Sequence, residues 1–182
     1  MDLTVILATI PERRQLRTEA VRSVESQTVT PKWLLVEEDV NHCGPAWTFN
    51  RLAERVSTEW LFPFADDDLL DENHFEVLAP HLSAEWDVVY SWPRLTGRDI
   101  PPDLFQREEP FENLRDHNWI SGSACIRTSL WRQLGGYRTV FHEDHDLWKR
   151  ALDVGARFKC VPRVTWTYRT DSDWWHVSDG RP

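Results

Sequence analysis

Three consecutive aspartates, Asp66, Asp67 and Asp68, come directly after the apolar run 60–64, which is typical of a buried strand. If the chain stays extended, Asp66 and Asp68 point to one side and Asp67 to the other. Repulsion among adjacent carboxylates disfavours such a run unless a cation or solvent offsets it. Mg²⁺ and Mn²⁺ take oxygen ligands and commonly bridge carboxylates to substrate phosphates. The run therefore predicts a site for a divalent metal ion and a diphosphate.

A second acidic cluster runs from His142 to Asp146, at the start of a predicted helix over 144–154. Acidic residues at that end of a helix have an ordinary structural role, because they interact favourably with the helix dipole. The alternative is that one of these carboxylates is a general base. The cluster taken by itself leaves both interpretations open.

Length and charge limit the classes of function. A chain of 182 residues can form one domain with a substantial core, and we expect a single domain over 1–182. The net charge of -9 argues against broad electrostatic binding to DNA or to anionic membranes. The sequence has no apolar stretch long enough for a transmembrane segment and no signal-peptide pattern, so cytoplasmic localisation is the default expectation.

The elements that must position these residues alternate along the first half of the chain. Apolar runs predict strands, and apolar residues at helical spacing predict helices, the third of which is capped by Asp71. The predicted strands are 3–8, 33–36, 60–64 and 86–92, and the predicted helices are 12–27, 46–56 and 71–82. Such alternation indicates an α/β fold with a parallel sheet and right-handed crossovers.

The second half is less regular. Residues 93–118 are rich in proline and charge, and we interpret them as a long loop in an acceptor region. Further elements are predicted beyond it, a strand at 120–126, helices at 128–134 and 144–154, strands at 157–161 and 164–168, and a tail at 170–182.

Polar residues follow each of the first three predicted strands. Thr9 and Arg13 follow the first, Glu38 and Asp39 the second, and the aspartate run the third. Ligands of open α/β sheets bind outside the carboxyl ends of the strands, so these groups converge if the strands are neighbours. For Asp39 alone, an ordinary turn is the simpler interpretation. Arg169, at the end of the last predicted strand, could reach a phosphate, although an exposed arginine is commoner there.

Taken together, these segments resemble the family-2 glycosyltransferases of the GT-A fold, from about Leu3 to Arg169. The order and spacing of the matching segments carry the resemblance. They are the first strand and its Thr/Pro/Arg loop (5–14), Ser-x-x-x-Gln-Thr (23–28), Phe49-Asn50-Arg51, the aspartate run, Ile120-Ser121-Gly122-Ser123, Gly135-Gly136-Tyr137 and Glu143-Asp144. One departure is Ala65, which stands where many members carry the first aspartate of the metal motif.

The resemblance implies a mostly parallel central sheet flanked by helices, and a metal-dependent, inverting transfer of a sugar from a nucleotide-diphosphate sugar to an acceptor hydroxyl. A UDP-sugar is the expected donor, with Mn²⁺ or Mg²⁺ as the ion. The expected base is Asp144, with Glu143 as the alternative. We assign Asp66 and Asp68 to the metal, with Asp67 able to replace either, and add His176 because some GT-A enzymes use a late histidine. The expected donor contacts are Thr9, Pro11, Arg13, Glu38, Asp39, Asn50, Asp66 and Asp67.

The acceptor is less defined. A saccharide or a lipid-linked acceptor is the family's usual case, and a modified base in DNA is a further candidate that the acidity of the chain weighs against. An aromatic platform for stacking on a sugar or a nucleobase could be framed by the loop 93–118 together with Trp119, Trp131, Trp174 and Trp175.

Two other functions remain open. A nucleotidyltransferase also uses acidic metal ligands on a parallel sheet, but it usually has a glycine-rich N-terminal loop, and residues 8–14 contain no glycine. The chain also lacks the GxxxxGK[ST] and GxGxxG motifs. The other possibility is a non-catalytic nucleotide-sugar-binding module of the same fold, against which the presence of both acidic clusters counts.

Overall fold

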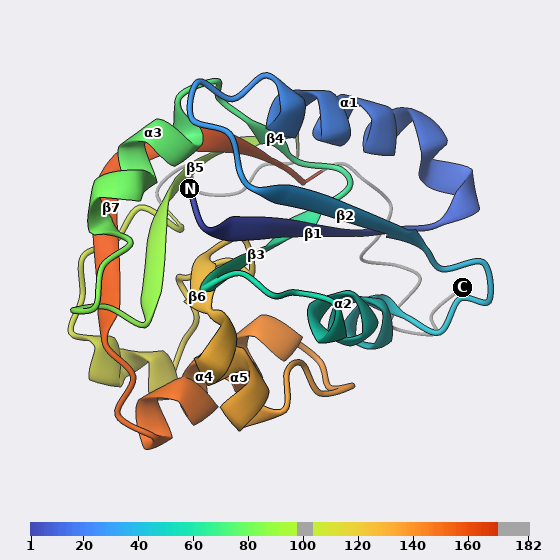
Figure 1. The fold of residues 1–182 in the computed structure, drawn as a ribbon. Helices are drawn as coiled ribbons and strands as arrows, with labels where there is room; N and C mark the ends of the chain where they lie inside the picture. The colour runs from blue at the N-terminus through green and yellow to red at the C-terminus, as the bar shows by residue number, and fades with distance from the viewer. Residues whose placement is uncertain (98–103, 171–182) are drawn as a thin grey trace.

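The structure is a computed structural model that describes residues 1–97 and 104–170. Its strands form one curled seven-stranded sheet in the order β2-β1-β3-β6-β5-β7-β4, and helices cover both faces of that sheet (Figure 1). This arrangement confirms the predicted α/β class. None of the helices in the described part of the chain is long and apolar enough to cross a bilayer.

One half of the sheet is parallel. β1 (Leu3–Thr9) lies between β2 (Trp33–Glu38) and β3 (Trp60–Ala65) and pairs in parallel with both. Thr9 is in register with Glu38, and Ala8 with Ala65, so the three strands end at the same edge of the sheet. The polar residues that follow these strands are therefore brought to one edge.

The other half combines both orientations. β5 (Val88–Thr96) pairs in parallel with β7 (Phe158–Arg169), whereas β4 (Leu69–Leu70) runs antiparallel to β7. β6 (Cys125–Arg127) joins the two halves and is antiparallel to both of its neighbours. The antiparallel ladders are short and the parallel ladders long, so the sheet is mostly but not wholly parallel.

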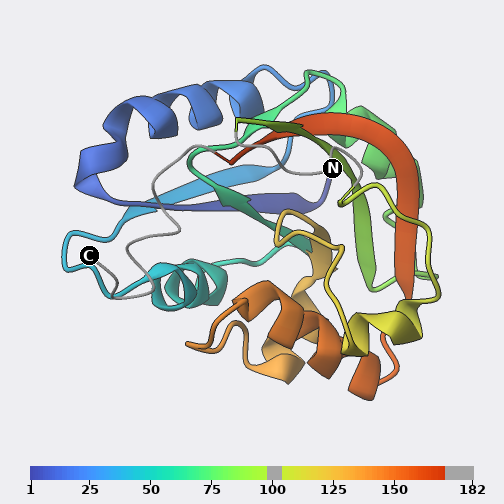
Figure 2. The ribbon, with the colours of Figure 1, turned by 180° about the vertical axis from the view of Figure 1, so that it is seen from behind.

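Two cores hold the helices on the sheet. One face of the sheet is covered by α1 (Arg14–Glu25), which follows the short helix η1 (Pro11–Arg13), and by α3 (His74–Leu78) with η2 (Ala79–His81) (Figures 1 and 2). The other face is covered by α2 (Pro45–Glu54), α4 (Thr128–Leu134) and α5 (Glu143–Asp153). Alternate side chains of β1 pack into the two cores, since Val5 packs with α1 and Ile6 packs with α2. Burial on both faces explains the continuous apolar run of this strand.

Several expected boundaries were wrong because tertiary pairing overrode the local pattern. β5 continues to Thr96, inside the segment 93–118 that we expected to be a loop, because β7 pairs with it along its whole length. That segment also contains the short helix η3 (Phe111–Arg115). β7 runs unbroken through Pro162, where two strands were expected. The strand expected at 120–126 is reduced to β6, and the glycine segment before it is irregular.

The helix expected over 71–82 is also shorter. α3 begins after Asn73, and the carboxylate of Asp71 pairs with Arg94 at 3.4 Å instead of capping the helix. The Asp71 carbonyl accepts a hydrogen bond from the His74 backbone at 2.9 Å, which forms a turn before the helix.

The turn that closes α4 depends on two glycines. Gly135 and Gly136 have φ of +74° and +70°, a region that glycine adopts without steric cost. The side chain of Asn50, on α2, receives the Tyr137 N–H at 2.9 Å and donates to the Tyr137 carbonyl at 2.8 Å. Arg150, on α5, donates to the carbonyl of Gly136 at 2.8 Å. The turn is thus held from both neighbouring helices.

We expect Gly136→Ala to destabilise the protein more than Gly135→Ala. Both substitutions place a side chain at positive φ, which costs about 1–2 kcal/mol. A Cβ on Gly136 would also overlap the Asn50 carboxamide oxygen, whereas a Cβ on Gly135 would meet open space. Overpacking should lower the free energy of unfolding of Gly136→Ala by roughly another 1–3 kcal/mol.

Urea denaturation of both variants measures the difference, and Gly135→Ala is the matched control for backbone strain. Equal losses of stability in the two variants would show that the contact with Asn50 does not constrain the turn.

Candidate active site

The two acidic clusters of the sequence lie in one cavity. It has a volume of about 530 Å³ and opens at the carboxyl ends of β1 and β3, with the segment between α4 and α5 on its other side. Asp66, Asp67 and Asp68 line it from the sheet, and Glu143 and Asp144 line it from the start of α5. The cavity thus brings the two acidic clusters together. Of the polar groups expected to converge at the strand ends, Arg13 and the aspartate run are among its described lining residues, whereas Thr9, Glu38 and Asp39 are not.

Arg13 bridges the first two aspartates. Its two terminal nitrogens donate to Asp66 Oδ1 and Asp67 Oδ2, each at 2.7 Å. The other oxygen of Asp66 accepts a hydrogen bond from the Thr9 hydroxyl at 2.6 Å. Burial raises the pKa of Asp66 to about 6, against the lowering by Thr9 and by the charge of Arg13. Both oxygens of Asp66 are thus engaged by protein groups.

Asp68 lies deeper, with 2% of its surface exposed. Its Oδ1 accepts the backbone N–H of Arg169 at 3.1 Å, and burial, followed by the charge of Asp67, raises its pKa well above the usual value. The Arg169 guanidinium donates to the Asp67 carbonyl and to Glu19, the latter at 2.6 Å. The expectation that Arg169 would be exposed was wrong, because this network leaves only 19% of its side chain exposed.

These contacts bear on whether a divalent ion fits. Among the described residues, no group of three or more His, Cys, Asp or Glu side chains forms a metal cage. An ion here would need part of its coordination from a ligand, as Mg²⁺ and Mn²⁺ commonly take it from phosphates. Asp67 and Asp68 line the cavity with hard oxygen donors, and the ionised form of Asp68 is poorly compensated. These carboxylate oxygens fit an ion of that kind. Asp66 is the aspartate whose oxygens are most fully engaged by protein groups.

Glu143 and Asp144 open α5. His142, the residue before them, has a left-handed conformation with φ of +57°, which turns the chain sharply into the helix. Asp144 Oδ1 accepts the His145 backbone N–H at 2.7 Å, and Oδ2 accepts a hydrogen bond from the Asn118 amide at 3.3 Å. Burial raises the pKa of both carboxyls, which suits a group that must take up a proton.

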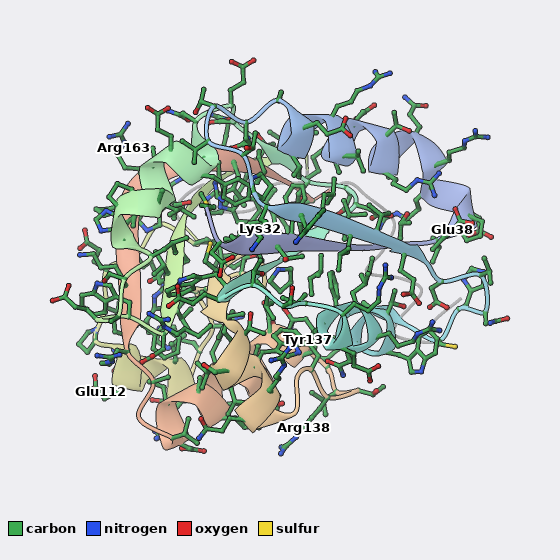
Figure 3. All side chains as sticks on the ribbon, in the orientation of Figure 1. Lys32, Glu38, Glu112, Tyr137, Arg138 and Arg163 are labelled. Carbon is green, nitrogen blue, oxygen red and sulfur yellow. The ribbon has the colours of Figure 1, made fainter. Side chains whose placement is uncertain are left out.

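Gly122 leaves space beside this carboxylate. A Cβ on Gly122 would come within 2.9 Å of the Tyr137 hydroxyl and 3.6 Å of the Asp144 Cβ. Tyr137 is buried against Phe49 and Trp131, whereas its neighbour Arg138 points outward (Figure 3). A side chain at position 122 would therefore have to displace the Tyr137 hydroxyl, whereas its contact with the Asp144 Cβ would be an ordinary van der Waals contact.

Other residues predicted to contact the donor make structural contacts. Pro11 opens η1 at the surface, and Thr9 holds Asp66, as described above. Asn50 clamps the turn at Tyr137. None of the three is among the described residues that line the cavity.

The acidic pair after β2 is also outside the described lining. Glu38 is exposed at the edge of the sheet and pairs with Arg17 at 2.5 Å (Figure 3). Asp39 is buried, and its Oδ2 accepts the Gly44 N–H at 2.7 Å. Asp39 therefore orders the turn that leads into α2, which is the simpler role considered for it alone.

The proposed aromatic platform is only partly described. Trp119 and Trp131, the latter on α4, are both buried in the core, so their assignment to an open platform was wrong. His176, Trp174 and Trp175, like the rest of the tail after Thr170, lie outside the described residues.

Sequence reasoning missed several lining residues. The segments 43–46 and 139–141 form much of the cavity wall, and Tyr168 contributes from the end of β7. Asn118, which donates to Asp144, was not predicted individually, because only the loop 93–118 as a whole was assigned to an acceptor region. The positive φ of His142 had no sequence signal, since histidine does not require it.

Comparison with known proteins adds the fold relationship. No protein-family model and no curated protein sequence matches the chain. Solved structures do match. TarS (residues 1–349) from S. aureus has a TM-score of 0.77 at 16% identity, covering 93% of this chain and 60% of its own. The chain has the GT-A glycosyltransferase fold. The complex of TarS (residues 1–349) with UDP-GlcNAc matches this chain with a TM-score of 0.76 at 16% identity, covering 93% of this chain and 58% of that one.

A second relative by structure is the mannosyltransferase PcManGT from Pyrobaculum calidifontis, in complex with GDP-Man and Mn²⁺. Its TM-score is 0.69 at 15% identity, and the match covers 96% of this chain and 59% of that one. The match thus spans about three fifths of the TarS fragment 1–349 and of the PcManGT chain, and 37% of the longer solved TarS chain.

We expect Arg13→Met to destabilise the protein far more than Arg17→Met. Loss of Arg13 leaves the buried Asp66 and Asp67 carboxylates without their shared cation, and breaking a buried pair costs about 3 kcal/mol or more. Arg17 pairs with the exposed Glu38, and such pairs contribute less than about 1 kcal/mol. Urea denaturation measures both losses.

The double variant Arg13→Met with Asp66→Asn serves as the control. It removes one of the two uncompensated carboxylates together with the guanidinium and should therefore recover part of the lost stability. If Arg13→Met were no more harmful than Arg17→Met, the bridge would not be what holds the aspartates together.

Proposed function

We propose that the chain is a metal-dependent, inverting glycosyltransferase that moves a sugar from a nucleotide-diphosphate sugar to an acceptor hydroxyl. The observation that carries the proposal is the meeting of two acidic clusters, from β3 and from α5, across one cavity at the carboxyl ends of the strands. The fold supports it, because structures of this fold hold UDP-GlcNAc in TarS and GDP-Man with Mn²⁺ in PcManGT.

The sheet side of the cavity is assigned to the donor. Asp68, with Asp67 or Asp66, would hold Mn²⁺ or Mg²⁺, and His176 stays a predicted ligand outside the described residues. A bound ion would supply charge stabilisation for the departing diphosphate. Arg13 and Arg169 are the cationic side chains that line this cavity. They place positive charge beside the aspartates, where the diphosphate would lie.

The α5 side is assigned to the base. Asp144 would accept the proton of the acceptor hydroxyl as the oxygen attacks the anomeric carbon, and the bond from that carbon to the diphosphate breaks with its electron pair leaving on the diphosphate. Direct displacement of this kind inverts the anomeric centre. Glu143 is the alternative base, since it is half-buried and lines the same cavity.

The donor assignment remains a UDP-sugar, with a GDP-sugar as the competing choice that the second relative suggests. The remaining predicted donor contacts are Thr9, Pro11, Glu38, Asp39 and Asn50. In this structure they would act by shaping the site, since their described contacts are with protein groups.

Nucleoside diphosphates should stabilise the protein in a metal-dependent way. A thermal-shift screen of UDP, GDP and their sugars, with Mn²⁺ or with EDTA, is expected to raise Tm for one diphosphate and only with the ion. A hundredfold excess over Kd corresponds to roughly 2.7 kcal/mol of stabilisation.

Asp68→Asn should abolish the ion-dependent part of that shift, and Asp71→Asn, whose carboxylate pairs with Arg94 outside the cavity, should keep it. If no diphosphate raised Tm under any condition, the proposed donor site would be refuted. Binding without turnover would instead favour the non-catalytic module.

Asp144→Asn should lower the rate of transfer by orders of magnitude while leaving donor binding roughly intact. Loss of a positioned general base lowers the rate by about 10²- to 10⁴-fold. Glu143→Gln, the matched neutralisation one residue away, should cost less. Initial rates of sugar transfer, with the UDP-induced thermal shift as a measure of donor binding, make the comparison. Unchanged transfer in Asp144→Asn would remove this residue from the role.

The same assignment predicts a pH dependence. The base must be ionised, and burial raises the pKa of Asp144, so kcat/KM should fall with decreasing pH already above the usual aspartate range. Asn118→Leu removes a hydrogen-bond donor that favours the ionised form, and it should move this acidic limb to still higher pH.

A further inference from the structure

The guanidinium of Arg13 occupies the place that a cation bridging the aspartates would take. Its two terminal nitrogens lie 2.7 Å from Asp66 Oδ1 and 2.7 Å from Asp67 Oδ2, and only 11% of the side chain is exposed. A divalent ion that bridged these two carboxylates would use the same oxygens. Two cations at one pair of carboxylate oxygens repel each other. The guanidinium and an ion in this position therefore exclude one another.

The Arg13 side chain can leave the aspartates without a change of fold. Arg13 is the last residue of η1, none of whose residues is buried, and its backbone N–H donates to the Ile10 carbonyl at 3.1 Å. The long arginine side chain can therefore move to another rotamer while the backbone of η1 stays in place. Since Arg13 lines the cavity, its guanidinium can turn into the space that a diphosphate would enter.

Arg169, the other arginine of the cavity, is placed differently. Its guanidinium donates to the Asp67 carbonyl and to Glu19 on α1, the latter at 2.6 Å, and its backbone N–H donates to Asp68. None of these described contacts uses the carboxylate oxygens that Arg13 occupies. Arg169 can therefore stay in place when those oxygens take another cation.

The charge of the cavity decides when such an exchange is favourable. Its described lining includes five carboxyl groups, three from the aspartate run and two from Glu143 and Asp144, against two arginines. A diphosphate alone would add negative charge to a space that is already acidic. A divalent ion alone would have to break both Arg13 ion pairs with no phosphate to accept the guanidinium. The exchange is favourable when both ligands are present, because the guanidinium then passes from one anion to another.

We propose that Arg13 is an exchangeable counter-ion, which neutralises Asp66 and Asp67 in the ligand-free protein and moves to the diphosphate when a divalent ion binds these carboxylates. The inference rests on the proposed function and adds how the same site is regulated. The exchange couples the two ligands, because each removes a cost that the other would meet alone. Loss of Arg13 should therefore strengthen binding of the ion and weaken binding of the diphosphate. An arginine that only supported the fold would weaken both when removed.

Binding of Mn²⁺ alone is measured by the loss of the EPR signal of free Mn²⁺ as protein is added. Arg13→Met removes the guanidinium and keeps a side chain that is also unbranched. It should bind Mn²⁺ at least roughly tenfold more tightly than the wild type, since one nearby like charge is removed. UDP should raise the affinity of the wild type for Mn²⁺, and this increase should be smaller in Arg13→Met.

Diphosphate binding is measured by calorimetric titration of UDP at saturating Mn²⁺, with GDP in its place if the thermal-shift screen selects it. Arg13→Met should bind the diphosphate at least roughly tenfold more weakly, the size expected for one hydrogen bond to a charged group. Arg115→Met is the matched control. Arg115 pairs with Asp153 at 2.7 Å in an exposed ion pair, and Arg115 is not among the described lining residues of the cavity, so both affinities should stay unchanged.

Thermal unfolding is followed in the same samples, because Arg13→Met is expected to be less stable. Mn²⁺ alone should raise Tm of Arg13→Met more than that of the wild type, since the ion takes over the neutralisation of Asp66 and Asp67. Arg13→Lys covers the case in which Arg13→Met does not fold. It keeps the positive charge but lacks the planar fork that donates to both carboxylates, so it should shift the two affinities in the same opposite directions by smaller factors.

Either of two results in a folded Arg13 variant overturns the proposal. One is binding of Mn²⁺ alone that is no tighter than in the wild type, and the other is binding of the diphosphate that is as tight as in the wild type. The proposed function is tested separately by the thermal-shift screen. A Mn²⁺-dependent shift with a diphosphate, together with either result, would reject the exchange and leave the donor site standing. The absence of any such shift would reject the donor site itself.

Discussion

The site depends on one guanidinium. Three adjacent aspartates at the end of a buried strand repel one another, and the low exposure of Asp66 and Asp68 makes their ionised forms costly. Arg13 offsets this by bridging Asp66 and Asp67 at 2.7 Å each. It does so from η1, directly after β1, so the neutralising cation and the acids are brought together by the same parallel pair of strands. Without that pairing, neither charge could be kept at this depth.

The same edge of the sheet explains what the sequence could predict. β1, β2 and β3 begin as apolar runs and are followed by polar residues, and parallel strands end together, so simple patterning indicated the edge of the sheet where the cavity lies. The role of each residue did not follow. Asp39 and Asn50 were assigned to a ligand, yet both have backbone partners that come from turns, and turn geometry has no clear signature in residue types. The extension of β5 was missed because its partner β7 is about 70 residues away in the chain.

The side of the cavity proposed for the base is positioned differently from the side proposed for the donor. The aspartate run is placed by strand pairing, whereas Glu143 and Asp144 are placed by the turn after α4, which Asn50 and Arg150 hold through backbone carbonyls and an N–H. Gly122 and Gly136 are the positions where this arrangement leaves no room for a side chain. Backbone clamping of this kind constrains geometry while tolerating changes among the surrounding side chains, which is consistent with a shared fold at 16% identity.

A smaller cavity of about 440 Å³ shares Asp144 with the first, and its lining includes residues 104, 105, 116 and 117, which contribute nothing to the aspartate network. Exchange of these residues would alter the surroundings of Asp144 without disturbing the strand ends that gather the acids. A laboratory library confined to residues 104–117 would also keep Asn118, which donates to Asp144. Such a library would separate changes around this carboxylate from changes in the aspartate network.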